Sequence, residues 1–466
     1  MSKFFEAIAN IFRVPDLRKR VLFTLGLLAV YRLGGHIPTP GINFSAWEQF
    51  FSHNQGTIFG FLDLFAGGNV RRLTVFALGI MPYITASIIL QLLTVVIPTL
   101  EKLQKEGELG RRKITQWTRY LTVGLSIVQS FGIAQGLMAM QGGVVINPGF
   151  GFVMLTIISL TTGTAFIMWL GEQITDRGVG NGMSLIIFAG IVVGLPSAIH
   201  NIYQNTFITH EWTVLHLIVI LAMMVVVVGF IVLVERGERR IPVQYAKRVV
   251  GRRVMGGQST HMPLKVNAGG VIPVIFASSI LAFPQTLAAL PVAKNTPWLN
   301  AMLTSIRHGE PLYYVLFIAG IIFFCFFYVS IIFNPNEAAD NMRKYGGFIP
   351  GIRPGRNTAD YMNEILTKIT VVGGIYLSIL CLIPDIMISG IKLQHLPLVG
   401  NWIDNYFPRF LLDGLNVQFY FGGTSLLIVV GVAMDTVNQI EAQLIMRHYE
   451  GFTPRSGRIR GRRSSF

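Results

Sequence analysis

The sequence predicts an all-α polytopic membrane protein with ten spanning helices in two inverted pseudo-symmetric halves. Three observations predict this class. Of the 466 residues, 52% are hydrophobic and only 13% are charged, with a mean hydropathy of +0.55, whereas roughly a quarter of the residues of a soluble domain are charged. Ten apolar runs approach the ~20 residues that a helix needs to cross a bilayer. Segments in the first half of the chain recur in the second half.

The ten runs are long and apolar on every side, whereas strands of a membrane barrel alternate over about ten residues. The first run is the weakest because Arg32 and Pro38 interrupt it. A basic stretch precedes it, as in a signal peptide, but no small-residue cleavage site follows, so we expect a retained helix. The predicted spans are 21–38, 73–98, 118–140, 152–171, 184–203, 214–234, 270–290, 312–333, 369–388 and 417–437.

Charge placement predicts the orientation of these spans. An even number of spans puts both termini on one side, and that side carries 31 of the 38 Lys and Arg residues but 16 of the 23 Asp and Glu residues. The opposite side therefore has no net charge. Cytoplasmic loops are enriched in Lys and Arg, so we expect a multi-pass protein of the cytoplasmic membrane with both termini in the cytoplasm.

Two pairs of segments reveal the inverted repeat. GIMPYITASIIL from Gly79 and GVIPVIFASSIL from Gly270 share seven of twelve positions, and the spans that contain them cross the membrane in opposite directions. GMSLIIFAGI from Gly182 and GTSLLIVVGV from Gly423 share five of ten. Spans 1–5 and 6–10 are thus predicted to be inverted halves, and a pathway is expected where such halves meet.

Aliphatic residues occupy the repeated positions. Ile84 corresponds to Ile275 and Ile187 to Ile428, and Ile80 lies one helical turn before Ile84. Converging aliphatic side chains cannot coordinate an ion, but they can form a collar that excludes water. Lipid-facing or core packing is the competing explanation for any single Ile. Pro82 and Pro273 are expected to kink their helices near Leu78 and Gly269.

Several other classes of function find little support. Cys325 and Cys381 both lie inside spans, so no disulfide framework or metal quartet is expected. The sequence has no HExxH or P-loop motif, and RGVGNG at Arg177 fits a tight turn better than a phosphate site. We therefore expect no cofactor and no enzymatic activity. A secondary solute transporter with inverted repeats is the alternative, but no clear acidic residue lies in the middle of any span.

Long stretches of the chain closely resemble the bacterial SecY family of protein-translocation channels. The likeness runs from about residue 13 to residue 443 and includes FALGIMPYITASIILQLLTVV, MWLGEQITDRGVGNGMS, QSTHMPLKVNAGGVIPVIFASSI, FIPGIRPGRNTADY and YFGGTSLLIVV. The resemblance implies two halves clasping a central hourglass pore. It further implies a passive channel that carries unfolded secretory polypeptides across the bacterial cytoplasmic membrane and releases transmembrane segments laterally into lipid.

The resemblance also assigns roles to residues. It places Ile80, Ile84, Ile187, Ile275 and Ile428 in the pore ring. It implies a plug helix near 61–72, which includes Phe61, Leu62, Leu64, Phe65, Ala66, Gly67 and Gly68. It implies a lateral gate between spans 2–3 and 7–8, where Gln91, Gln129, Ser278 and Ser279 could pair across the closed gate or act as ordinary interhelical contacts.

Two basic cytoplasmic loops, 235–269 and 334–368, are expected to dock partners. The basic cluster Lys247, Arg248, Arg252 and Arg253 suits phosphates or an acidic surface. The resemblance implies docking at both loops and assigns the coupling position to Arg353. The implied partners are the small subunits SecE and SecG, the motor ATPase SecA or the ribosome as energy source, the translocating polypeptide with its signal sequence, and anionic lipid. The expected division is a half at 1–203, a half at 204–446 and a basic disordered tail at 447–466.

Overall fold

The computed structural model describes residues 14–53, 63, 66–139, 143–209, 214–245, 248–250, 253–255, 259–287, 296–306, 309–389 and 423–450. Each of the ten predicted apolar runs falls on a helix or, for the fifth, on a pair of helices. These are α2 (Pro15–Gly34), α5 (Met81–Val96), α7 (Glu108–Met138), α8 (Phe150–Arg177), α9 (Gly182–Val193) with α10 (Leu195–Tyr203), α11 (Val214–Glu235), α12 (Ile272–Leu287), α15 (Pro311–Ile332), α17 (Arg356–Ser389) and α20 (Gly423–Glu450).

Within the described residues, six helices are long and apolar enough to cross a membrane alone. They are Glu108–Met138, Phe150–Arg177, Gly182–His200, Pro311–Lys344, Arg356–Pro384 and Thr424–Leu444. Met81–Val96 meets the same criteria together with Pro98–Gln104, across a bend of 105°. The apolar parts of α11 and α12 are shorter, at Leu221–Glu235 and Ile272–Ala282. Together with α2, these helices make up the predicted ten.

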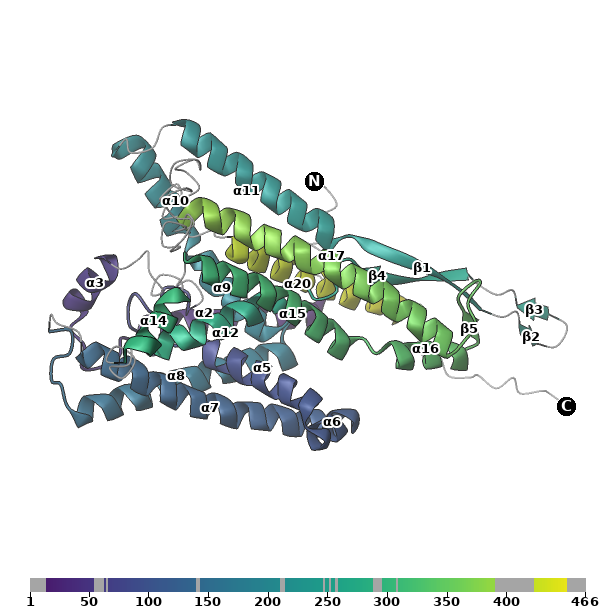
Figure 1. Ribbon diagram of the computed structural model, residues 1–466, viewed down its shortest axis with the longest axis horizontal. Helices are drawn as coiled ribbons and strands as arrows, with labels where there is room; N and C mark the ends of the chain where they lie inside the picture. The colour runs from purple at the N-terminus through teal and green to yellow at the C-terminus, as the bar shows by residue number, and fades with distance from the viewer. Residues whose placement is uncertain are drawn as a thin grey trace, which may run out of the picture.

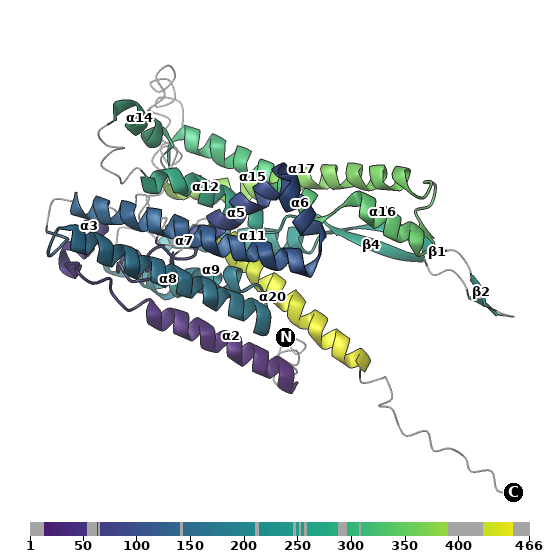
Figure 2. The same cartoon turned by 90° about the horizontal axis from the view of Figure 1, so that it is seen from below.

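The long helices run roughly side by side along the longest axis of the molecule (Figures 1 and 2). The shorter elements gather toward opposite ends. Helices α3 (Phe44–His53) and α14 (Pro297–Ser305) lie toward one end, while α6 (Pro98–Lys105) and α16 (Pro335–Lys344) lie toward the other. A further segment, η1 (Gln204–Ile208), continues α10 as a π-helix. Connections that alternate between two ends are what a multi-pass topology requires.

The two repeated helices begin later than predicted, and the predicted proline kinks are wrong. Residues 73–80 form turns with an isolated bridge at Thr74 rather than the start of a span, so α5 begins at Met81. α12 begins at Ile272, two residues after the predicted start. Pro82 and Pro273 are the second residues of these helices. A first-turn N–H has no partner inside the helix, so proline costs no hydrogen bond there and its φ suits the helix. Both prolines therefore start helices instead of bending them.

A small β-sheet, absent from the predictions, occupies the loop between α11 and α12. Strand β1 (Glu238–Tyr245) pairs antiparallel with β4 (Ser259–Lys265), with Glu238 opposite Lys265, and β5 (Gly347–Phe348) pairs with the other edge of β1. Along β1, Ile241 and Val243 are buried between exposed neighbours. They join Met362 and Ile365 in a separate hydrophobic cluster. The two predicted docking loops are thus packed together as one unit.

Two helices extend beyond their predicted spans, into a predicted loop and into the predicted tail. α17 starts at Arg356, inside the predicted 334–368 loop, and α20 continues to Glu450, so residues 447–450 of the predicted disordered tail are helical. Residues 451–466 lie outside the described part of the chain. A second pair of strands, β2 (Arg248–Val250) and β3 (Arg253–Met255), forms a short hairpin.

Candidate functional site

The structure brings all five predicted isoleucines into one hydrophobic cluster shared by the two halves. Ile80, Ile84, Ile187, Ile275 and Ile428 are each at most 6% exposed, and Val271 belongs to the same cluster. They come from the start of α5, from α9, from α12 and from α20. α5 packs against α12, and α9 packs against α20, so each contact joins one half to the other.

The repeat places these side chains at equivalent positions. Ile84 and Ile275 are each the fourth residue of their helix, whereas Ile187 and Ile428 are each the sixth. The backbone N–H of Ile84 donates to the carbonyl of Ile80 (3.1 Å), and that of Ile275 donates to Val271 (3.3 Å). The predicted spans, 73–98 and 270–290, place Ile84 near the middle of its span and Ile275 near one end. The later start of α5 removes that difference.

A cavity of about 440 Å³ borders this cluster. Ile84, Ile187 and Ile275 form part of its lining. The rest is mostly polar, with Ser87 and Gln91 from α5 among the lining residues. A second cavity, of about 220 Å³, shares five lining residues with the first: Asn181, Ser184, Ile272, Ile275 and Tyr328. We call the two cavities together the vestibule. It is a polar space that meets an aliphatic wall.

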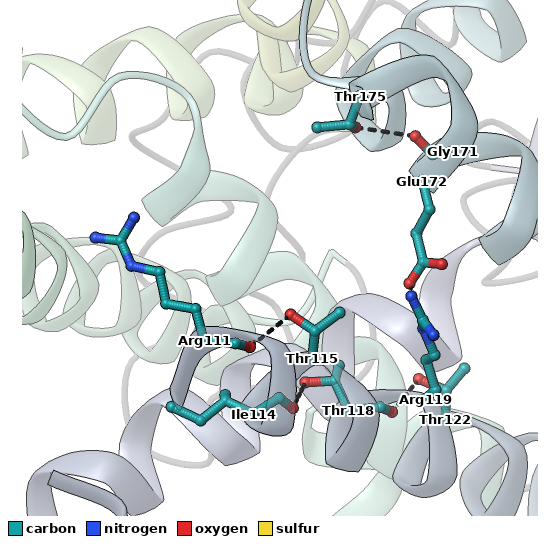
Figure 3. Close-up of polar contacts among 9 residues, drawn as sticks. All are labelled: Arg111, Ile114, Thr115, Thr118, Arg119, Thr122, Gly171, Glu172 and Thr175. Carbon is teal, nitrogen blue, oxygen red and sulfur yellow. Dashed lines mark hydrogen bonds and ion pairs between the residues drawn. The ribbon is translucent and has the colours of Figure 1, made fainter. Parts of the chain in front are cut away.

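An ion pair bridges two helices on the wall of the vestibule (Figure 3). Arg119 Nε of α7 donates to Glu172 Oε1 of α8 at 2.8 Å. The hydroxyls of Thr115 and Thr175 donate to backbone carbonyls of their own helices, at 3.0 and 2.9 Å. In the close-up, Arg119 and Glu172 point toward each other, while Arg111 points away from the pair. The pair thus ties α7 to α8 beside the cavity.

The plug residues are only partly described. Phe61, Leu62, Leu64 and Phe65 lie outside the described residues. Ala66 is helical and 2% exposed, but residues 67–72 are turns rather than the predicted helix, because Gly67 and Gly68 adopt left-handed backbone angles (φ +70° and +81°). A Cβ on Gly67 would lie 2.7 Å from the Cα of Gly190 in α9. The end of the predicted plug is therefore in close backbone contact with α9.

Residues around this segment were missed by the sequence reasoning. The carboxylate of Asp63 accepts the N–H of Arg71 at 2.8 Å, and burial raises the pKa of Asp63 to about 6. Asn69 and Tyr31 are buried at 2% and 5% exposure and contact each other across 38 residues of sequence. An Asn after a glycine pair is an ordinary turn signal, so no sequence signal identified its partner.

The predicted gate residues lie on the expected helices. α12 packs against both α5 and α7. Ser279 Oγ donates to Ile275 O (2.7 Å) and lies 3.7 Å from Met81 Sδ of α5. Ser278 Oγ bonds Ile275 O, Gln91 Nε2 donates to Ser87 Oγ within α5, and Gln129 is buried in α7. Among these contacts, that of Ser279 with Met81 crosses between α12 and α5.

The predicted docking residues that the structure describes lie in the β2–β3 hairpin and in the turn before α17. Lys247 and Arg252 lie outside the described residues, while Arg248 and Arg253 belong to β2 and β3. Arg353 is exposed in the turn before α17, and its carbonyl accepts the hydroxyl of Thr358 at 2.9 Å. Among the described residues, no group of three His, Cys, Asp or Glu side chains is arranged to hold a metal ion.

Comparisons with known proteins agree with this architecture. The profile of the SecY family matches residues 74–437. The protein translocase subunit SecY of Escherichia coli K12 is 50% identical over 439 residues, covering 93% of each chain. Two solved structures share the fold over 93% of this chain and 94% of theirs. One is described as a SecY channel whose plug domain stabilises the closed state (TM-score 0.60, 18% identity), and the other as Sec61 in a canine ribosome–channel complex (TM-score 0.56, 17% identity).

Proposed function

The chain belongs to the SecY family, and on this basis we propose that it is the pore-forming subunit of a protein translocase. It passes unfolded secretory polypeptides across the cytoplasmic membrane and releases apolar segments sideways between α5 and α12. One observation carries this proposal: the five buried isoleucines meet where residues 1–203 and residues 204–446 contact each other, beside a polar vestibule. An aliphatic constriction blocks water and ions yet makes no specific hydrogen bonds with a passing chain.

The proposed orientation places the vestibule and the sheet unit in the cytoplasm, with both termini. It rests on the excess of basic residues on that side. The channel itself is passive, and a cytoplasmic partner supplies the energy. The related Sec61 structure is a ribosome–channel complex, and the exposed Arg353 with the basic β2–β3 hairpin suits either ribosomal phosphates or the motor SecA. SecE and SecG are the proposed small membrane subunits, and anionic lipid contacts the basic tail.

Ion conductance tests the seal. Ile84→Ser, Ile275→Ser and Ile428→Ser each put a hydroxyl into the constriction, so the resting channel in a planar bilayer should leak ions. Ile321→Ser is the matched control, because Ile321 is also fully buried in this cluster but lies on α15, outside the repeat-related positions. Equal leak from Ile321→Ser, or no leak from the three variants, would contradict the proposed seal.

Crosslinking tests the path of the polypeptide. A stalled secretory chain should crosslink to Cys placed at Ile84 or Ile428 and not to Cys at Ile321, in a chain with Cys325 and Cys381 replaced by Ala. Labelling at Ile321 alone would show that the cargo follows another route.

A further inference from the structure

The segment 66–74 contains the described end of the predicted plug and leads toward α5, and contacts that the family assignment does not explain hold it on three sides. We call it the anchor segment. All its residues are described, and its contacts reach α2, α3 and α9. A role for the anchor segment rests on the proposed function, because its position matters only if the chain forms a channel that must be sealed at rest.

On the first side, two buried side chains converge on one carbonyl. The Tyr31 hydroxyl of α2 donates to the carbonyl oxygen of Ala66 (3.2 Å), and Asn69 Nδ2 donates to the same oxygen (2.5 Å). Asn69 Nδ2 also lies 3.4 Å from the Tyr31 hydroxyl. All three residues are at most 5% exposed. Because a buried carbonyl without a partner is costly, these donors determine whether Ala66 remains in this position.

On the second side, the anchor segment touches the elements that carry the ring isoleucines. Gly67 packs with its backbone against Gly190, three residues beyond Ile187 in α9. A Cβ on Gly79, the residue before Ile80, would lie 3.3 Å from the Cα of Ala66. Movement of Ala66 and Gly67 would therefore open space next to two of the ring positions.

On the third side, α3 and the backbone of Thr39 hold the remainder of the segment. Trp47 Nε1 of α3 donates to the carbonyls of Val70 (3.1 Å) and Arg71 (3.0 Å). The N–H of Thr39 donates to the carbonyl of Leu73 (3.0 Å). Leu73 has a left-handed φ of +44°, a strained conformation that persists only where its surroundings impose it. Residues 70–73 are thus held by contacts that involve neither Tyr31 nor Asn69.

We infer that Asn69 is a positioning residue for the seal: with Tyr31, it holds Ala66 and Gly67, the described end of the predicted plug, against α9 in the resting channel. Each hydrogen bond contributes modestly once exchange with water is counted. The anchor is therefore strong enough to bias the resting channel and weak enough to be released by an arriving polypeptide. Asn69 acts on the ring through Gly67 and does not touch the polypeptide itself.

Resting conductance of the complete complex in a planar bilayer tests this role. Asn69→Ala and Tyr31→Phe each remove a donor to Ala66, so the open fraction at rest should rise roughly 5- to 30-fold, the factor that corresponds to about 1–2 kcal/mol. Thr39→Val is the matched control. It also deletes one buried hydroxyl close to the anchor segment, but that hydroxyl has no hydrogen-bond partner among the described residues, so the conductance should not change.

A second readout separates positioning from general destabilisation. Ala66→Cys, in a chain with Cys325 and Cys381 replaced by Ala, reports on the burial of residue 66 through its rate of modification by a membrane-impermeant thiol reagent. Asn69→Ala should accelerate the modification well below the thermal unfolding midpoint. A lower midpoint with an unchanged modification rate would show a merely structural role and overturn the inference.

The outcomes distinguish this inference from the proposed function. If Ile84→Ser leaks ions while Asn69→Ala and Tyr31→Phe do not, the proposed seal is supported and the inferred role of Asn69 is wrong. If no isoleucine variant leaks, the proposed seal fails, and the modification rate of Ala66→Cys still decides whether Asn69 holds the segment.

Discussion

The helices α5 and α12 begin with the same backbone conformation in different surroundings. Gly79 and Gly270 both have a left-handed φ, of +56° and +60°, and each precedes a proline in the first helical turn. A Cβ on Gly79 would meet the Cα of Ala66, whereas a Cβ on Gly270 would meet no atom of the described residues within 4 Å. Gly270 lines the smaller cavity of the vestibule instead. The repeat thus determines how each helix starts, while within the described part of the chain it is the amino-terminal half that fills the adjacent space with its own backbone.

The fifth and tenth spans show the same difference. Gly190 in α9 and Gly431 in α20 are equivalent in the repeat. Gly190 receives the backbone of Gly67, while a Cβ on Gly431 would lie 2.2 Å from Cγ2 of Val271. Each half uses a glycine to admit a close neighbour. In one half that neighbour is the anchor segment, which the proposed function requires to move, and in the other it is a side chain of the cluster.

The largest expected effect comes from the backbone contact in the amino-terminal half. Gly67→Ala should cost about 1–2 kcal/mol for the left-handed backbone and about 1–3 kcal/mol more for the overlap with Gly190. Gly68→Ala and Gly270→Ala should cost only the first amount, because no described atom lies within 4 Å of either Cβ position. The thermal unfolding midpoint of the purified complex measures all three.

Gly68→Ala is the closest control, since it is the next residue and has a similar φ of +81°. Equal destabilisation by Gly67→Ala and Gly68→Ala would show that the contact with Gly190 is not tight, and the contrast between the halves would then disappear.

A smaller effect is expected in the carboxyl-terminal half, where the neighbour is a side chain. Gly431→Ala should destabilise by about 1–3 kcal/mol, because Val271 is β-branched and cannot easily turn away. Val271→Ala removes the overlapping methyl group, so the double variant should cost less than the sum of the single variants, with a coupling of roughly 0.5–3 kcal/mol. Thermal unfolding of the three variants gives the coupling.

Gly229→Ala provides the baseline for this measurement. It replaces a helical glycine in α11 where a Cβ has no neighbour within 4 Å among the residues that the structure describes, so it should be neutral or slightly stabilising. Strict additivity of Gly431→Ala and Val271→Ala would mean that Val271 is not the obstacle.

The sequence predicted the features that depend on local composition. Ten apolar runs indicated ten helices, and the repeat identified Ile84, Ile187, Ile275 and Ile428 as a group, which the structure places in one buried cluster. The start of α5 was misplaced because Val75, Phe76 and Leu78 continue the apolar run. These residues lie in turns, where they face other parts of the protein. Apolarity alone cannot distinguish a buried turn from a lipid-facing helix.

Features that depend on distant partners were not predictable. Asn69 contacts Tyr31 across 38 residues, and Arg119 contacts Glu172 across 53, and no local pattern marks either pair. The β1–β4 hairpin was missed for another reason. Its alternation is visible in Ile241 and Val243, but the basic character of the loop suggested a solvated docking segment. Those two residues have a core to enter because residues of α15, α16 and α17 pack against the sheet.

The smallest expected difference concerns the ion pairs on the walls of the vestibule. In the amino-terminal half, Arg119 and Glu172 are 2.8 Å apart and their side chains are 48% and 16% exposed. In the carboxyl-terminal half, Lys265 and Asp435 are 3.9 Å apart and both are about half exposed, at 47% and 53%. Double-mutant cycles by thermal unfolding, with Ala at each position, should give a coupling of up to about 1 kcal/mol for the first pair and close to zero for the second.

High salt should reduce the first coupling, because partly exposed charges are screened, and a coupling unchanged at 1 M salt would contradict this prediction. The magnitude also bears on the state of the cavity. Removing one partner of an ion pair that is shielded from water destabilises a protein by several kcal/mol. A loss of that size on Glu172→Ala alone would therefore mean that this wall is dry. A dry wall is incompatible with a vestibule that admits a hydrated polypeptide as far as the isoleucine cluster. A weak, salt-sensitive pair is what a water-filled vestibule requires.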